Sequence, residues 1–512
     1  MSADPGYQLQ RATNRIAVLE QMLTIAQKGD ELRESVARIF SLSLVGKDVL
    51  RIGAKGLGGL CNSAQNATLV FSVALAWGQQ APMGAFLTSA CPKTDMPTDV
   101  RLPPSWNDAA ATALLHRHGA MRAPSKKLCV TLEFFNVPRA VIASSRPGAC
   151  TRFALPVAAP VGCVNTAAPF PPEALPAPPS AQRRAQWWPF RRSSPPPQPP
   201  PPPSPPWPAD MPLCSHQESA LPGLWVRRAT ELVLTDELDP RHGYYAPSGC
   251  RTREQGVRSP IAQLQWLHVV GDSVTYNLFP SFKRAFASAV GEEVGWGLRD
   301  RPRGMPQWIC ECTIDRRRCV TMSAWYDKGG AGKARPSEPL RLPALPAREE
   351  MPFQQCTANV SAARPDVTIV SLGSHSNWGA DAEAHKRYVK GFTMWLKSQQ
   401  APRTAGVVLA LQTARGIRGI PPKFGGIDTI CTATNMRIQL NNDAQATSLR
   451  HVCERLGRAD SYRVLDLFSP TLPWAASGSV FKMGDPIHFR GLGVFWAKHL
   501  VVDVLRSLFE PA

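Results

Sequence analysis

The segment LQWLHVVGDSVTYNLFPSFKRAFASAV, residues 264–290, decides the fold. Its first seven residues are mostly apolar, which is typical of a short strand buried on both faces of a sheet. A tight turn, Gly271-Asp272-Ser273, comes next, and the spacing of apolar residues from Leu278 to Val290 indicates a helix. The segment therefore predicts one strand–turn–helix step of an α/β fold.

The same alternation of short apolar runs and longer amphipathic segments continues toward the C-terminus. Further strands are expected at Val367–Leu372, Gly406–Gln412 and Tyr462–Phe468, and further helices at Asp381–Ser398, Met436–Leu456 and Phe489–Phe509. Strands that alternate with helices are normally parallel and joined by right-handed crossovers. We therefore predict an α/β three-layer sandwich with a mainly parallel, flavodoxin-like sheet.

Length and proline content divide the chain of 512 residues, which contains 50 prolines. Consecutive prolines before position 213 enforce extended polyproline II, which indicates a semi-rigid spacer or a docking ligand for aromatic grooves. We expect a poorly ordered, partly helical N-terminal region of unassigned role over residues 1–180. A linker follows over 181–213, and the α/β domain occupies 214–512. The apolar run within residues 67–90 is considered as a weak membrane segment.

Charge and cysteine content suggest partners and a compartment. With 58 basic and 39 acidic residues the net charge is +19, which favours acidic polysaccharide, a membrane surface or nucleic acid. Nucleic acid is not expected, because the basic runs lack interleaved aromatic residues. Sequons at Asn66 and Asn359 and eight cysteines after the linker fit a secretory route, Golgi or extracellular. Buried thiols in a reducing cell are the alternative. These cysteines are Cys214, Cys250, Cys310, Cys312, Cys319, Cys356, Cys431 and Cys453.

Ser273 is the candidate nucleophile. Ligands of parallel sheets bind beyond the carboxyl ends of the strands, where Ser273 is expected. It would also lie near the amino end of a helix, whose free amides stabilise a developing oxyanion. The alternative is that Asp272 or Ser273 simply caps the helix.

Asp485 and His488 supply the partners for such a nucleophile, in the string Met483 to Phe489, MGDPIHF. If both lie on a single turn, Asp485 can hold one imidazole nitrogen while the other accepts the proton of Ser273. A capping Asp beside an unrelated His explains the string equally simply. The two motifs together, at opposite ends of one domain, favour a Ser-His-Asp triad.

These motifs resemble the GDSL-type SGNH hydrolases. The narrower resemblance, over about Leu224 to Leu508, is to the PC-esterase group that includes the plant trichome-birefringence-like polysaccharide O-acetyltransferases. Trp225-Val226 and Cys250 are similar to that group's lead-in, and Asn277 matches its GDS-L-x-R-N pattern. Tyr276 replaces the arginine of the pattern, which removes a fixed positive charge.

The middle block of the family is matched less closely, by SLGSHSNW from Ser371 to Trp378. The resemblance implies that Gly373 supplies an oxyanion donor. Asn377 or His375 is either a side-chain donor or only a helix cap. Asn435-Met436-Arg437-Ile438 with Asn441 is similar to a family helix, or is simply a solvated face.

The resemblance implies a serine-dependent O-acyltransferase or esterase, most simply for acetyl groups, that acts on glycan hydroxyls or esters through an acyl-enzyme. The expected partner is a glycan, acidic if the basic surface contributes, with membrane association expected only through residues 67–90. Neither a metal nor an organic cofactor is required, and the acyl donor stays open. The alternative is a non-catalytic wall or glycan-binding protein with a degenerate hydrolase fold.

Overall fold

The computed structural model describes both halves of the chain in part. The described residues are 40–45, 48–54, 67–77, 84–90, 98–102, 126–138, 156–165, 224–227, 243–246, 261–291, 296–300, 308–315, 317–324, 359–371, 394, 406–416, 435–455, 457, 459–475, 481–482, 485–489 and 498–510. The expected linker over 181–213 lies outside them, as do the expected helical stretch near the start and, apart from Met394, the expected helix Asp381–Ser398.

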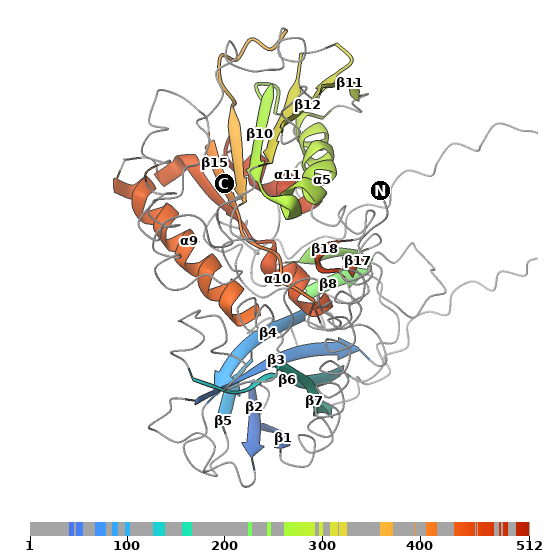
Figure 1. Ribbon diagram of the computed structural model, residues 1–512, viewed down its shortest axis with the longest axis vertical. Coiled ribbons are helices and arrows are strands. Elements are labelled where there is room, and N and C mark those ends of the chain that lie inside the picture. The colour runs from blue at the N-terminus through green and yellow to red at the C-terminus, as the bar shows by residue number, and fades with distance from the viewer. Residues whose placement is uncertain are drawn as a thin grey trace, which may run out of the picture.

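A sheet of strand order β11-β12-β13-β10-β14-β15-β16 forms the centre of the C-terminal half (Figure 1). Its strands are β10 (Trp266–Gly271), β11 (Trp296–Asp300), β12 (Trp308–Thr313), β13 (Cys319–Ala324), β14 (Val367–Ser371), β15 (Gly406–Ala410) and β16 (Tyr462–Leu465). The neighbouring strands from β13 to β16 in this order are parallel, which confirms the predicted mainly parallel sheet. Antiparallel β11 and β12 extend one edge, and neither these two strands nor β13 were predicted.

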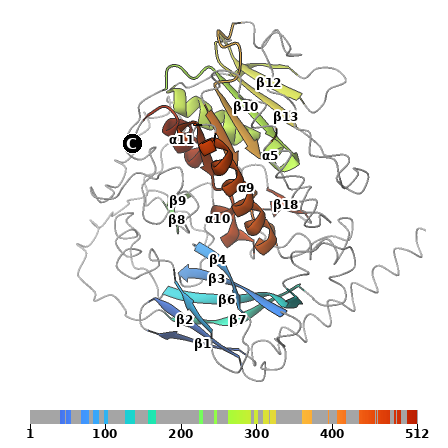
Figure 2. The same cartoon turned by 90° about the vertical axis from the view of Figure 1, so that its left-hand side faces the viewer.

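Helices cover both faces of this sheet, as Figures 1 and 2 show. They are α5 (Ser273–Val290), α9 (Asn435–Arg455) and α11 (Lys498–Ser507). Because successive strand residues point to opposite faces, Val269 of β10 packs in one core with residues of α5 and α11. Val270 packs in another core with Leu449 and Val452 of α9. The result is the expected three-layer arrangement.

The predicted elements differ from the observed ones mainly at their ends. The helix expected from Leu278 begins at Ser273, because the Asp272 side chain caps its first turn. The last helix was expected from Phe489, but α11 begins at Lys498, and Phe489 belongs to the strand β18 (Asp485–Phe489). Strand β16 ends at Leu465, before a short helical segment formed by α10 (Phe468–Thr471) and η6 (Leu472–Trp474).

Part of the N-terminal region, expected to be poorly ordered, forms two antiparallel sheets (Figure 2). One contains β1 (Phe40–Val45), β2 (Val49–Ala54) and β5 (Thr98–Arg101); the other contains β3 (Ala67–Trp77), β4 (Gly84–Ala90), β6 (Lys126–Pro138) and β7 (Pro156–Asn165). The stretch over 67–90 that was considered as a weak membrane segment contains β3 and β4, which pair antiparallel. Membrane association of this stretch stays a prediction. A short apolar run is common to buried strands and helices, so its pattern alone does not separate them.

The N-terminal strands pack against the α/β domain through β4. Ala85 and Leu87 are buried in one cluster with Phe468, Leu472 and Ala475, which belong to α10, η6 and the residue after them. This contact reaches the chain between β16 and the small antiparallel pair of β17 (Phe481–Lys482) and β18. Among the described residues, no helix has the length and apolar content to cross a bilayer.

Candidate active site

Ser273 is the first residue of α5, directly beyond the carboxyl end of β10. The buried Asp272 carboxylate accepts a hydrogen bond of 2.9 Å from the amide of Val274 and so ends the strand and starts the helix. The side chain of Ser273 stays partly exposed. Its backbone amide is among the first four of α5, which have no acceptor within the helix. The predicted position at a helix N-terminus is confirmed.

The turn before Ser273 needs glycine at position 271. A Cβ atom there would lie 2.1 Å from Oγ1 and 2.3 Å from Cβ of Thr275, closer than any real contact. Thr275 is fully buried, and its hydroxyl donates a hydrogen bond of 3.3 Å to the carbonyl of Ser371. Ser371 is the last residue of β14 and pairs with Gly271 in the parallel ladder. The first turn of α5 is thereby tied to the end of the neighbouring strand.

His488 reaches Ser273 from β18. Its Nε2 atom lies 2.9 Å from Oγ of Ser273, across 215 positions of sequence. The neighbours Ile487 and Phe489 are buried in the main core with residues of α5. Because side chains alternate along a strand, burial of these two turns the partly exposed His488 to the other side. The predicted contact between the two motifs is therefore present.

The local backbone geometry predicted at Asp485 is wrong. Asp485 and His488 were expected on a single turn, but both lie in the extended strand β18. In a regular strand, residues three apart point to opposite faces, so their spacing alone does not bring them together. The side chain of Asp485 lies outside the described residues. Its contact with His488 stays a prediction.

The other predicted site residues are only partly described. Asn277 is partly exposed on α5, one turn after Ser273, which places it beside Ser273 along the helix. Gly373, His375 and Asn377 lie outside the described residues, and their expected oxyanion roles stay predictions.

Two asparagines on α9 shape the rim beyond β15. The Asn442 side chain accepts from the amide of Gln412 at 2.9 Å and donates to its carbonyl at 3.0 Å. Asn435 makes the same pair of bonds with Arg415, at 2.8 and 3.1 Å. Each amide side chain thus pairs with the backbone amide and carbonyl of one residue, as a neighbouring strand would, and so fixes the buried residues 411–416. The resemblance singled out Asn435, but no local pattern indicated Asn442.

Asp466, which sequence reasoning missed, follows β16 at the same end of the sheet. It is buried and accepts hydrogen bonds from the amides of Phe468 and Ser469, at 2.8 and 3.0 Å. Burial raises its pKa to about 6, although these hydrogen bonds act in the opposite direction. A lone Asp within the apolar run of the predicted strand Tyr462–Phe468 was the available signal. Its contacts show that it orders the start of α10.

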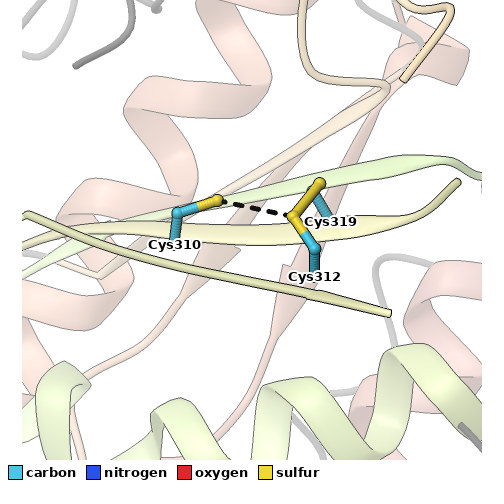
Figure 3. A group of neighbouring side chains, drawn as sticks. All are labelled: Cys310, Cys312 and Cys319. Atoms are coloured by element: carbon cyan, nitrogen blue, oxygen red, sulfur yellow. Dashed lines mark hydrogen bonds between the residues drawn. A yellow bond between two sulfur atoms is a disulfide. The ribbon is translucent and has the colours of Figure 1, made fainter. Parts of the chain in front are cut away.

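The sulfur atoms of Cys310, Cys312 and Cys319 lie within 4.8 Å of one another, as a metal site would require (Figure 3). Cys312 and Cys319, directly opposite each other on β12 and β13, form a disulfide. Cys310 is also disulfide-bonded, and its sulfur lies 3.8 Å from that of Cys312. Metal binding by cysteine requires thiolates, so these oxidised residues do not fit a resident metal. Cys453 is buried on α9.

Comparisons with known proteins do not assign this chain to a family. No protein-family model and no curated protein matches it. Among solved structures it is similar to LAE5, an α/β hydrolase from the metagenome of Lake Arreo, Spain, at 12% identity over 48% of this chain and 96% of that one, with a TM-score of 0.25. A peptidoglycan O-acetylesterase is similar at 12% identity over 49% and 93%, with a TM-score of 0.29.

A third similar structure is a protein named as an arylesterase from Agrobacterium tumefaciens strain C58. It has 17% identity over 48% of this chain and 100% of its own, with a TM-score of 0.21. At scores this low the three similarities assign neither a family nor an activity.

Proposed function

We propose that this protein is a serine-dependent acyl-ester hydrolase or O-acyltransferase with Ser273 as nucleophile and His488 as general base. One observation carries the proposal: the 2.9 Å contact between Oγ of Ser273 and Nε2 of His488. A hydroxyl is a weak nucleophile unless a base within hydrogen-bond reach removes its proton, and this distance meets that requirement. The position of Ser273 at the N-terminus of an 18-residue helix adds an electrostatic contribution.

In the first half-reaction Nε2 of His488 takes the proton of Ser273 as Oγ attacks the ester carbonyl. In this proposal the backbone amide of Ser273, in the first turn of α5, donates to the resulting oxyanion, and Gly373 is the expected second donor. When the tetrahedral intermediate collapses, the C–O bond to the alcohol breaks and the alcohol leaves with the proton held by His488. Ser273 then carries the acyl group.

In the second half-reaction water or a sugar hydroxyl attacks the acyl-enzyme, and His488 again moves the proton. Water gives an esterase and a sugar hydroxyl gives a transferase, with the same residues in both cases. For His488 to act as base at Nε2, its Nδ1 atom must carry the proton. We propose that Asp485 accepts that hydrogen bond, in the role that the family resemblance implies.

The proposed substrate is an O-acylated, most simply O-acetylated, glycan. The family resemblance supports this choice, and the net charge of +19 favours an acidic sugar chain through long-range attraction. A secretory location, Golgi or extracellular, belongs to the same proposal. Nucleic acid is not proposed as a partner, and the acyl donor of a transferase stays open.

Covalent labelling tests the nucleophile. The full chain should react with a fluorophosphonate probe and hydrolyse a small chromogenic acetate ester, and Ser273→Ala should abolish both. Ser288→Ala, near the other end of α5, is the matched control and should keep both. Unchanged labelling of the Ser273→Ala protein would overturn the proposal.

Product analysis distinguishes the esterase from the transferase. The acyl-enzyme formed from the chromogenic ester is offered a glycan acceptor, and the acylated sugar and free acid are quantified. A non-catalytic glycan-binding protein would give neither product and no labelling, yet would retain the glycan. The Ser273–His488 contact favours the enzyme.

A further inference from the structure

We propose that Asn359 accepts an N-linked glycan when the chain folds in the secretory lumen. Asn359-Val360-Ser361 has the acceptor pattern Asn-x-Ser, in which the middle residue is not proline. The tripeptide lies in a turn before β14. Asn359 and Ser361 are exposed, whereas Val360 is fully buried. The acceptor side chain therefore lies on the surface, on a turn that the middle residue anchors.

The anchor of this turn is the cysteine cluster. Val360 packs with Trp266, Cys310, Cys312 and Cys319 in one buried group. Figure 3 shows the sulfur atoms of the three cysteines gathered at this place. The proposed glycan site at Asn359 and the disulfide-bonded cysteines are thus neighbours in the structure.

The contacts of Ser361 set the order of events. Its hydroxyl donates to Oε1 of Gln265 at 2.6 Å, and its amide donates to the same oxygen at 3.2 Å. The hydroxyl that completes the acceptor pattern is therefore engaged once the domain has folded. Glycan transfer must precede closure of this turn onto β10.

The disulfides require the same compartment as the glycan. Cys312–Cys319 joins β12 to β13, and Cys129–Cys163 joins β6 to β7 in the N-terminal sheet. Such bonds persist in the secretory lumen and outside the cell but are rare in the cytosol. N-linked glycans are added in the same lumen, so two independent features of the chain point to one route.

A glycan at Asn359 would leave the candidate active site open. Ser361 contacts Gln265 just before β10 begins, whereas Ser273 follows the other end of that strand. At about 3.3 Å per residue, the two ends of β10 lie about 17 Å apart. A glycan at Asn359 would therefore lie near the end of β10 that is opposite the candidate active site.

The transfer step balances with a lipid-diphosphate-linked oligosaccharide as donor. The Nδ2 atom of Asn359 bonds to C1 of the first sugar as the C1–O bond to the diphosphate breaks. The lipid diphosphate leaves, and one amide proton passes to the transferase. No oxidant or reductant takes part.

The test is the full chain, expressed in eukaryotic cells behind a cleavable secretory leader. Mass spectrometry of the peptide containing Asn359, after enzymatic glycan release in ¹⁸O water, should show conversion of that asparagine to labelled aspartate. Ser361→Ala should abolish occupancy and Ser361→Thr should retain it. Asn66→Gln, which removes the other sequon, should leave occupancy at Asn359 unchanged.

Glycan occupancy at Asn359 in the unsubstituted protein is enough to decide the proposal. The test therefore does not depend on whether the variants fold. An unmodified Asn359 peptide in secreted, disulfide-bonded protein would overturn it, as would occupancy that survives Ser361→Ala. Fluorophosphonate labelling of Ser273 is measured on the same samples and should be the same with and without the glycan. The glycan and the proposed esterase chemistry are thus scored separately.

Discussion

Oγ of Ser273 and Nε2 of His488 lie 2.9 Å apart although 215 positions of sequence separate the two residues. Two local features produce this contact. The Asp272 cap ends β10 and starts α5 at Ser273, and burial of Ile487 and Phe489 turns His488 outward from β18. Changes to the structure around these two features should therefore alter activity even without touching the reacting atoms.

Gly271→Ala should destabilise the domain and reduce labelling of Ser273. The new methyl group would occupy the space of Thr275, 2.1 Å from its hydroxyl oxygen, and the buried turn must shift to admit it. We expect a loss of about 1–3 kcal/mol in the free energy of unfolding, the usual cost of overpacking. Urea unfolding and the labelling rate measure the two effects.

Gly53→Ala is the matched control for this change. The closest atom there is the rotatable hydroxyl oxygen of Ser41, and the next atoms lie 3.8 Å away. That variant should therefore unfold close to the parent. Equal stability of both variants would show that the space at Gly271 is not limiting.

Thr275→Val should lower kcat by about 10- to 100-fold with little change in KM, since small misplacements of reacting groups have effects of this size. Valine keeps the shape but removes the hydroxyl that donates to the carbonyl of Ser371, so α5 loses its link to the end of β14. Thr275→Ser keeps that hydroxyl and should restore kcat. Steady-state kinetics on a chromogenic acetate ester measures both.

Thr447→Val, at an exposed position of α9, is the control for replacing a threonine by valine. Its kcat and KM should equal those of the parent. If Thr275→Ser is as slow as Thr275→Val, the hydroxyl of Thr275 is not what positions Ser273. A purely structural role would lower the unfolding temperature of Thr275→Val without separating kcat from KM.

His268 should make the domain sensitive to acid. It is fully buried in β10 and lies 2.9 Å from the Thr321 hydroxyl, and burial lowers its pKa to about 3. The unfolded chain, with an ordinary histidine pKa of about 6.5, binds this proton first. Stability contributed by neutral His268 is therefore complete above pH about 6.5 and is lost as the pH falls toward 3.

His268→Gln keeps an acceptor for Thr321 but does not titrate, so its stability should fall less between pH 7 and pH 5. Denaturant unfolding at the two pH values measures the difference. The exposed His451→Gln on α9 should keep the slope of the parent. Parallel slopes for the parent and His268→Gln would contradict the assignment.

Asp466 should act in the opposite direction over part of this range. Its pKa of about 6 in the folded protein exceeds the ordinary value of about 3.9, so the folded protein binds the proton more tightly. This contribution is fully present below pH about 4 and is lost as the pH rises through 6. Asp466→Asn removes the titration and should flatten that part of the stability profile.

The asparagine oxygen can still accept from the amides of Phe468 and Ser469, so the variant should remain folded at pH 7. Asp460→Asn, at an exposed position, serves as the control. A profile for Asp466→Asn that matches the parent between pH 4 and pH 6 would place the titrating group elsewhere.

The central part of the sheet could be predicted because each element carries its own periodic pattern. The predicted ends agree with the observed ends to within two residues for the strands β10, β14 and β15 and for the helix α9. Ser273 was placed correctly at the end of β10, because strand, turn and helix follow one another in a single segment. Short-range sterics and the burial of both strand faces are enough to specify such units.

Local sequence patterns were thus enough to locate β10, β14, β15 and β16, the helices α5 and α9, and the place of Ser273 at the end of β10. Packing between distant segments, in contrast, set the antiparallel edge of β11 and β12, the strands at 67–77 and 84–90, and the extended backbone at Asp485 and His488. An apolar run is equally suited to a strand or a helix, and distant packing partners choose between them. For His488, that partner is the core that buries Ile487 and Phe489.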